Sequence, residues 1–447
     1  MSEAELRAVA PALLLAASGL IAGLLGLRIP GRRLAWLGAA AGLGAMVSAI
    51  ALGPPTAADA SESGAAVVRD GAAIFFVSLI GVLTAVLVAL VAAAPGRGTG
   101  PRDEVVLMLF AASGAALAVS AADLVVLFVG LALVTIPLYV LTGRSHRPGD
   151  EEPAIRHALL GGASSAMALY GIALLYTATG GTGYADLGRA THNPLYLAGL
   201  ALALTGIASH VVLAPAQRWS LVSTIAAAGA VLRLAAVTRS GEAALDWEVS
   251  LATLGALAIV TAAVAPLAER RVRWLVGYAT ISQLGFVAVA AASSAAPAAS
   301  FALAAYGATA VGLFGLVALL PSGEPVLADL AGFARRRPLV VLALGVIVLE
   351  LLGLPPTVGF IARLYVFEAA VRAQLLWMVV LGALATVSGT AIYARLVLAC
   401  FAPPPLDAVA PPRARVPTAI TLIAALAIVA AGVAPAPLLD AAQLVHF

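Results

Sequence analysis

Long apolar stretches separated by short polar connections occupy almost the whole chain. Each stretch is long enough to cross a bilayer as a helix, which takes about 20 apolar residues. They lack the period-2 alternation that a transmembrane β-barrel requires. The pattern therefore predicts an all-α polytopic membrane protein with about fourteen transmembrane helices. The predicted spans are residues 8–27, 35–52, 72–94, 105–121, 123–142, 157–179, 195–213, 221–238, 249–268, 274–293, 298–320, 338–371, 376–402 and 417–438.

The twelfth span, residues 338–371, is interrupted by Pro355 and Pro356. Two adjacent prolines break a helix because each lacks an amide hydrogen and crowds the preceding turn. Glu350 lies before the break, about 18 Å of helix beyond Pro338, which is a depth near the middle of a bilayer. We interpret Glu350 as a candidate functional carboxylate, since ionisable residues inside membrane spans are rare and mark ion pathways.

The seventh span shows a related arrangement. His210 precedes Pro215 by five residues, as Glu350 precedes Pro355. Broken helices at matching positions of two halves indicate a transporter built from repeats, with ionisable groups near the breaks. A chance coincidence is the alternative interpretation, because prolines are common in this chain.

Composition narrows the chemistry that the chain can perform. The chain is 62% hydrophobic and 11% charged, with a mean hydropathy of +1.05, far from the composition of a soluble domain. A single cysteine, Cys400, excludes an intrachain disulfide and a multi-thiolate metal site. The five histidines have no metal-ligand spacing, so we expect no cofactor in this chain. The net charge of +3 comes from dispersed arginines and predicts no binding of nucleic acid.

Arginine supplies all 25 basic residues, and lysine is absent. Arginine does not deprotonate in proteins, so a lysine-type proton relay cannot run through this chain. Arginines concentrate in the odd-numbered connections, and the positive-inside rule predicts that these are cytoplasmic and that both termini lie on the outer side. The arginines of the odd-numbered connections are Arg28, Arg32, Arg33, Arg97, Arg102, Arg144, Arg147, Arg156, Arg218, Arg270, Arg271, Arg273, Arg335, Arg336, Arg337, Arg413 and Arg415.

Two specific motifs, Y-A-T-I-S-Q-L-G and G-L-P-P-T-V-G-F-I-A-R, occur in residues 273–286 and 330–367. Together with residues 123–143 and 152–180, these segments resemble the antiporter-like membrane subunits of respiratory complex I. Within this family the chain is similar to the N-type subunits, because three spans precede the repeats and only a short segment follows the last span. Multisubunit cation/proton antiporters and membrane-bound hydrogenases share the same core.

The resemblance implies a bundle of fourteen helices with two inverted five-helix repeats. The expected domains are residues 1–104 with spans one to three, 105–238 and 249–402 with the two repeats, and 403–447 with span fourteen. Spans seven and twelve are the broken helices of the family and face a central hydrophilic axis. In the family, alternating ionisation of glutamates and lysines along this axis carries a proton across the membrane.

Most of the family's relay positions carry other residues here. The glutamate of span five is replaced by Ala132, and the lysine of span eight falls at Thr224 or Ile225. The lysine of span seven matches His210, and the polar residue of span ten matches Gln283. Arg363 occupies the basic position after the break of span twelve, and Arg156 occupies a position where the family carries a lysine. These matches make His210 and Glu350 the candidate proton carriers, with Gln283, Arg363 and Arg156 as candidates for the polar axis.

Three of the candidates have a structural alternative. His210 can exchange a proton near neutral pH, or it can bridge helices as a neutral hydrogen-bonded side chain. Glu350 can carry a proton, or it can serve as the fixed counter-ion of Arg363. Arg363 cannot deprotonate and is interpreted mainly as a structural cation. We expect Arg233 to extend toward the membrane interface.

Three side chains are expected to have structural or interfacial roles. Asp123 is expected at the start of span five, where a carboxylate complements the helix dipole. For Tyr306, packing is the expected role. Arg156 is expected to be mainly interfacial, because it lies at a helix start next to a charged loop.

The expected function is a contribution to proton translocation coupled to quinone reduction, as an N-type membrane-arm subunit of a NADH:quinone oxidoreductase in the bacterial inner membrane. Flavin, iron–sulfur clusters and quinone are expected in partner subunits of the membrane-bound complex. The alternatives are a non-pumping scaffold subunit that has lost its relay, and a subunit of a cation/proton antiporter or membrane hydrogenase. The sequence leaves the transported ion, proton or sodium, open.

Overall fold

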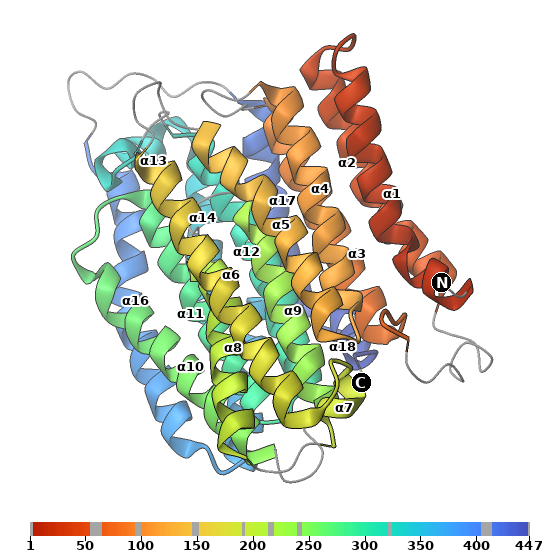
Figure 1. Cartoon of the computed structure of the whole chain (residues 1–447). Coiled ribbons are helices and arrows are strands. Elements are labelled where there is room, and N and C mark those ends of the chain that lie inside the picture. The colour runs from red at the N-terminus through yellow and green to blue at the C-terminus, as the bar shows by residue number, and fades with distance from the viewer. Residues whose placement is uncertain are drawn as a thin grey trace. The chain divides into compact units, whose positions relative to one another are not determined.

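The computed structural model describes most of the chain, and the described residues are helical with a few short connections (Figure 1). The described residues are 3–53, 65–93, 100–144, 152–189, 193–212, 219–238, 244–320, 324–403 and 414–445. Contacts divide the chain into two units. The first unit comprises Met1–Ala214, Trp219–Leu251 and Gln443–Phe447, and the second comprises Pro215–Arg218 and Ala252–Ala442.

Helices occur in each stretch that the apolar pattern predicts. Among the described residues, twelve helices are long and apolar enough to cross a membrane, while α8 and α14 are shorter apolar helices. Helices of the first part of the chain are α1 (Glu3–Leu25), α2 (Gly31–Leu52), α3 (Gly71–Ala93), α4 (Pro101–Ser120), α5 (Leu124–Arg144), α6 (Glu152–Thr179), α7 (Tyr184–Leu187), α8 (Pro194–Val212) and α9 (Ser220–Thr238). The later helices are α10 (Ala244–Val264), η3 (Ala265–Leu267), α11 (Val272–Ala292), α12 (Ala296–Val317), η4 (Leu327–Leu330), α13 (Phe333–Arg336), α14 (Pro338–Leu351), α15 (Val358–Arg372), α16 (Leu376–Phe401), α17 (Arg415–Val433) and α18 (Ala436–Gln443).

Small residues let neighbouring helices of the first unit approach closely. A Cβ atom on Gly42 of α2 would lie 2.7 Å from the carbonyl oxygen of Gly81 on α3, and one on Gly81 would lie 2.6 Å from that of Gly42. Gly114 of α4 and Gly130 of α5 approach each other in the same way, because a Cβ atom on Gly114 would lie 2.7 Å from the carbonyl oxygen of Gly130. Close backbone contact at small residues is the usual means by which helices associate in lipid.

A helix pair in each unit is closed by the same backbone pattern. Asp123, before α5, bridges antiparallel to Gly183, after α6, and Arg271, before α11, bridges in the same way to Val326, after α12. The N–H of Leu124 donates to the carbonyl of Thr182 at 2.9 Å, and the N–H of Val272 donates to the carbonyl of Pro325 at 2.8 Å. In each pair the donor directly follows the first bridge residue and the acceptor directly precedes the second. A short helix follows each bridge, with the sequence Y-A-D-L in α7 and L-A-D-L in η4. The same backbone pattern therefore occurs once in each unit.

The second unit packs the two parts of the broken twelfth span against α12 and α17. α14 and α17 contact each other, and both contact α12. The hydroxyl of Thr421 on α17 donates to the carbonyl of Gly312 on α12 at 3.5 Å. A Cβ atom on Gly432 of α17 would lie 2.2 Å from the carbonyl oxygen of Pro356, so the helix break lies directly against the α17 backbone.

Candidate functional site

The break between α14 and α15 is built by main-chain hydrogen bonds that end α14 in a defined way. Gly353 adopts a left-handed φ of +63°. Its N–H donates to the carbonyl of Glu350 at 2.8 Å, and that of Leu354 donates to Leu349 at 2.9 Å. This pair of bonds is the Schellman arrangement, in which glycine is preferred because it lacks a Cβ atom. The bond between Pro355 and Pro356 is cis.

Arg363 of α15 reaches back across the break. Its guanidinium donates to the carbonyl of Leu352 at 3.0 Å, to the carbonyl of Leu351 and to the hydroxyl of Thr386 on α16. The guanidinium carbon lies 4.4 Å from the ring centroid of Phe286, a cation–π contact. A Cβ atom on Gly353 would lie 2.4 Å from Cδ of Arg363, so the glycine also gives the arginine room. Arg363 therefore satisfies carbonyls that the end of α14 leaves free.

Glu350 lies in the last turn of α14, and its side chain is 1% exposed. It lies beside Thr309 of α12, whose hydroxyl donates to the carbonyl of Ala305 at 3.1 Å, and within range of the charge of Arg363. Its Oε2 atom has no hydrogen-bond partner among the described residues. Gly359 at the start of α15 packs on this carboxyl, since a Cβ atom there would lie 2.9 Å from Oε1. Because the guanidinium of Arg363 bonds to carbonyls and to Thr386, Glu350 keeps an unused oxygen inside the protein.

Hydroxyl groups extend the polar site from Glu350 along α12 and α11. Tyr306, one turn before Thr309, donates from its hydroxyl to Oγ1 of Thr280 on α11 at 2.8 Å, and all three side chains are buried. Tyr306 therefore makes a specific hydrogen bond in addition to the packing that the sequence predicts. Gln283, half-buried, lies one turn beyond Thr280 and one turn before Phe286, on the same face of α11.

Three of the five candidate residues, Glu350, Arg363 and Gln283, belong to the second unit, and two of them, Glu350 and Arg363, lie at its helix break. Sequence reasoning missed Thr280, Thr309 and Thr386, because threonines inside apolar helices carry no distinguishing local signal. The i, i+3 spacing of Tyr306 and Thr309 along α12 is the one pattern that could have indicated a polar face.

His210 and Arg156 belong to the first unit. His210 lies in α8, which ends at Val212, but its side chain and the predicted break at Pro215 fall outside the described residues. Arg156 lies in the first turns of α6, where its guanidinium pairs with Glu152 at 2.7 Å and its side chain is 70% exposed. Arg156 is thus a surface residue of its unit, in agreement with the interfacial interpretation.

The substituted relay positions of the first unit lie on helices as predicted. Ala132 lies in α5 with intermediate exposure. Thr224 is fully buried in α9, where its hydroxyl donates to the carbonyl of Ser220 at 3.0 Å. Neither side chain can carry charge, so at these two positions the described helices offer no substitute for the glutamate of span five and the lysine of span eight that the family carries.

The prediction for Arg233 is wrong. Its side chain is 2% exposed, and it forms an ion pair with Asp70, which precedes α3. Asp70 also accepts from the main-chain N–H of Ala73 at 2.8 Å, so it caps α3 as well as neutralising the arginine. The partner lies 163 positions away in the chain, which is why a rule based on distance from the helix end failed.

The predicted role of Asp123 at the start of α5 is confirmed, because its carboxylate accepts hydrogen bonds from the first N–H groups of the helix. Its Oδ1 accepts from the N–H groups of Val125 at 2.7 Å and Val126 at 3.3 Å, and Oδ2 accepts from the Thr182 hydroxyl at 2.6 Å. Tyr184 follows on α7 and is buried, and this burial raises the pKa of its hydroxyl above the ordinary range. The hydroxyl therefore stays protonated at neutral pH, and it has no hydrogen-bond partner among the described residues.

Comparison with known proteins places this arrangement among membrane subunits. The profile described as "NADH:quinone oxidoreductase/Mrp antiporter, TM" matches residues 121–389. NADH-quinone oxidoreductase subunit N of Geobacter metallireducens is 32% identical, and the match covers 100% of both chains.

Solved structures give the same result. A chain of respiratory complex I from Thermus thermophilus is 28% identical with a TM-score of 0.83, covering 96% of this chain and 98% of that one. A chain of the Mrp complex from Dietzia is 19% identical with a TM-score of 0.80, covering 98% of this chain and 96% of that one. The second likeness shows a shared fold alone.

Proposed function

The chain belongs to the NADH:quinone oxidoreductase/Mrp antiporter membrane family, and from this premise we propose that it is the N-type, antiporter-like subunit of a proton-translocating NADH:quinone oxidoreductase. The observation that carries the proposal is the end-to-end match to a subunit N, joined by the match to a complex I chain above 25% identity. The likeness to the Mrp complex is lower in identity, which favours the oxidoreductase over the antiporter.

Within this function, Glu350 is the proton carrier of the second unit. A buried carboxyl group whose Oε2 atom has no hydrogen-bond partner among the described residues can bind a proton and release it again. Arg363 keeps its charge close by and supplies a fixed positive potential. Hydroxyl groups both donate and accept hydrogen bonds, so Thr309, Tyr306 and Thr280 offer a polar route along α12 and α11.

His210 is the corresponding carrier of the first unit, because it is the titratable residue at the break of span seven. The alternative of a non-pumping scaffold rests on Ala132 and Thr224, which cannot ionise. Under either reading the redox chemistry belongs to partner subunits that hold flavin, iron–sulfur clusters and quinone. We place the chain in the bacterial inner membrane, with odd-numbered connections in the cytoplasm and both termini outside.

The deciding experiment measures protons moved per electron in proteoliposomes that contain the assembled complex. His210→Ala and Glu350→Gln should each lower this ratio and leave NADH oxidation by a soluble acceptor unchanged, because only the membrane arm is altered. His157→Ala and Glu368→Gln are matched controls, and Glu368 lies on α15 in an exposed pair with Arg372. Unchanged ratios in both test variants would remove both residues as carriers and establish the scaffold alternative.

A further inference from the structure

The helix break of the second unit is flanked by a buried tyrosine that the polar route described above does not include. Tyr393 lies on α16, and its side chain is 4% exposed. Its hydroxyl has no hydrogen-bond partner within the described part of the chain. We propose that Tyr393 is a proton-transfer residue that joins Glu350 to the end of the second unit where α16 ends. This inference rests on the proposed role of Glu350 as a proton carrier.

The ring of Tyr393 lies close to the break. A Cβ atom on Gly389, four residues earlier in α16, would lie 3.7 Å from both Cδ2 and Cε2 of the ring. The same Cβ atom would lie 3.5 Å from Cδ2 of Leu352, the residue whose carbonyl accepts from Arg363 at 3.0 Å. Long side chains of a helix point back toward its N-terminus, and here this direction leads from Tyr393 toward the end of α14.

Three buried polar atoms at the break keep unused hydrogen-bonding capacity. They are Oε2 of Glu350, Nε of Arg363 and the hydroxyl oxygen of Tyr393, none of which has a partner among the described residues. The carboxyl and the tyrosine hydroxyl both lie within range of the charge of Arg363. Buried polar groups are normally hydrogen-bonded, and internal water is a common partner where several such groups face one space. Water held by these atoms would link the tyrosine to the carboxyl group.

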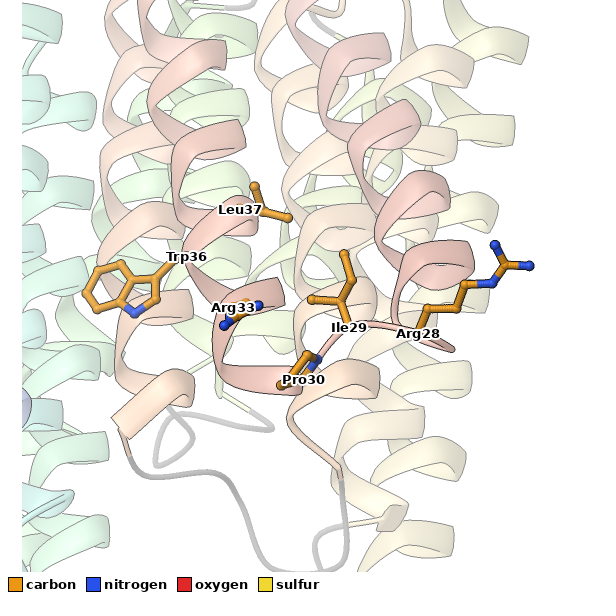
Figure 2. Close-up of a pocket in the computed structure, with 6 residues that line it drawn as sticks. All are labelled: Arg28, Ile29, Pro30, Arg33, Trp36 and Leu37. Carbon is orange, nitrogen blue, oxygen red and sulfur yellow. The ribbon is translucent and has the colours of Figure 1, made fainter.

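The open hollow at the corner of α1 and α2 differs in this respect. Arg28 and Arg33 line it, but both are exposed, and Figure 2 shows the guanidinium group of Arg28 pointing away from Arg33. Exposed guanidinium groups are satisfied by solvent, whereas a polar atom buried in the protein needs a partner there. The atoms at the break therefore indicate a function that the charged groups of the surface hollow do not.

Tyr393 lies between Glu350 and one end of the second unit. The segment before α14 and the end of α16 lie at the same end, because the N–H of Gly332 donates to the carbonyl of Ala402 at 2.9 Å. At 1.5 Å per residue, Glu350 lies about 18 Å from the start of α14 and Tyr393 about 12 Å from the end of α16. The arginine pattern predicts that this end is cytoplasmic.

The proposed transfer leaves the tyrosine unchanged. The Tyr393 hydroxyl gives its proton through water to the Glu350 carboxylate, while its oxygen takes a proton from water on the side of the α16 end. One O–H bond breaks and one forms at the tyrosine, one proton reaches Glu350, and no oxidant or reductant takes part. The fixed charge of Arg363 favours this order, because it stabilises negative charge developing on the tyrosine oxygen and repels a hydronium ion.

The test measures the rate of proton translocation in proteoliposomes that contain the assembled complex with Tyr393→Phe, which removes only the hydroxyl group. The rate should fall by about tenfold or more, since a positioned proton-transfer group contributes roughly 100-fold or more and water recovers part of the loss. Tyr365→Phe is the matched control, because Tyr365 is 37% exposed on α15 and its ring packs edge-on against Phe301. This control should change the rate by less than about twofold. An unchanged rate in Tyr393→Phe would overturn the inference.

A second measurement separates proton transfer from a structural role. The ratio of the rates in light and heavy water should rise in Tyr393→Phe, because proton transfer then limits the rate, and the thermal unfolding midpoint should stay the same. A slower variant with a lower midpoint and an unchanged isotope ratio would assign Tyr393 to packing and contradict the proposal.

Glu350→Gln in the same assay separates this inference from the proposed function. A loss in Glu350→Gln without one in Tyr393→Phe would remove the tyrosine and leave Glu350 as the carrier. An unchanged rate in Glu350→Gln would remove the carrier itself. The double variant should lose no more than Glu350→Gln alone, because the two groups act in series. Additive losses would show that the two residues act independently and would count against the tyrosine as a link to Glu350.

Discussion

At the helix break, Arg363 donates its hydrogen bonds to main-chain carbonyls, and this role decides what the residue contributes. Leu351 and Leu352 would otherwise leave buried carbonyls without donors, which is costly in an apolar environment. The sequence interpretation of Arg363 as a structural cation therefore agrees with its contacts. The carbonyl partners themselves could not be read from the sequence, because backbone atoms carry no residue signature.

Replacing Arg363 by methionine should destabilise the protein by about 2–4 kcal/mol, because two carbonyls and the Thr386 hydroxyl lose their donor. Arg363→Lys should recover part of the loss, since an ammonium group donates fewer bonds in a less fixed geometry. Thermal unfolding of the assembled complex measures the effect. Arg372→Gln, which removes an exposed pair from the end of the same helix, should cost less than about 1 kcal/mol. Equal effects of the two substitutions would contradict the role given to Arg363.

At the scale of elements, the apolar pattern located the helices well, because any membrane span must satisfy its backbone internally. The same pattern could not reveal the paired bridges, which join residues 60 and 55 positions apart, Asp123 with Gly183 and Arg271 with Val326. The shared A-D-L tripeptide after each bridge was a signal in the sequence, at Asp186 and Asp329, but three residues carry little weight without a backbone to compare.

The start of α11 should depend on pH through Glu269. Hydrogen bonds from the Arg271 side chain, together with the N–H groups of Arg270 and Arg271, lower the pKa of this carboxyl to about 2. A lowered pKa in the folded state gives stability that is fully present above the unfolded value of about 4.3 and is lost as the pH falls toward 2.

Glu269→Gln should therefore be less stable than the wild type by about 1–2 kcal/mol at neutral pH, and the difference should shrink between pH 4.3 and 2. Amide hydrogen exchange at Arg270 and Arg271 as a function of pH measures it. Glu324→Gln is the control, because Glu324 is 70% exposed and its carboxylate lies 3.8 Å from Arg271. A difference that persists unchanged at pH 2 would show that the carboxylate charge is not its cause.

At the scale of the whole molecule, the sequence was sufficient for fold and family but not for the state of the relay. The broken span and its motifs identify the family, while Ala132 and Thr224 show only what is missing. Whether His210 and Glu350 compensate depends on groups around them that come from distant segments, such as Thr309 and Thr280. Contacts between residues far apart in the chain leave no periodic pattern in a single sequence, so these neighbours could not be predicted from it.

The orientation of the chain can be tested with cysteines, because the single native cysteine is buried in α16 and can be replaced by serine. Arg189→Cys lies in an even-numbered connection, and its arginine is 81% exposed. It should react with a membrane-impermeant maleimide in spheroplasts. Arg32→Cys, in the first connection, should react only after the membrane is permeabilised. The reverse labelling pattern would place both termini in the cytoplasm.

The way Arg363 spans the helix break has a consequence for the timescale of charge transfer. Arg363 belongs to α15 and is hydrogen-bonded to the end of α14, so its side chain ties the two half-helices to each other across the break. The proposed proton exchange at Glu350 would then require only a turn of one carboxyl group, a motion of picoseconds to nanoseconds in unhindered side chains, and no slower sliding of helices. Gly359 leaves the room for this turn, because a Cβ atom at that position would lie 2.9 Å from Oε1 of Glu350.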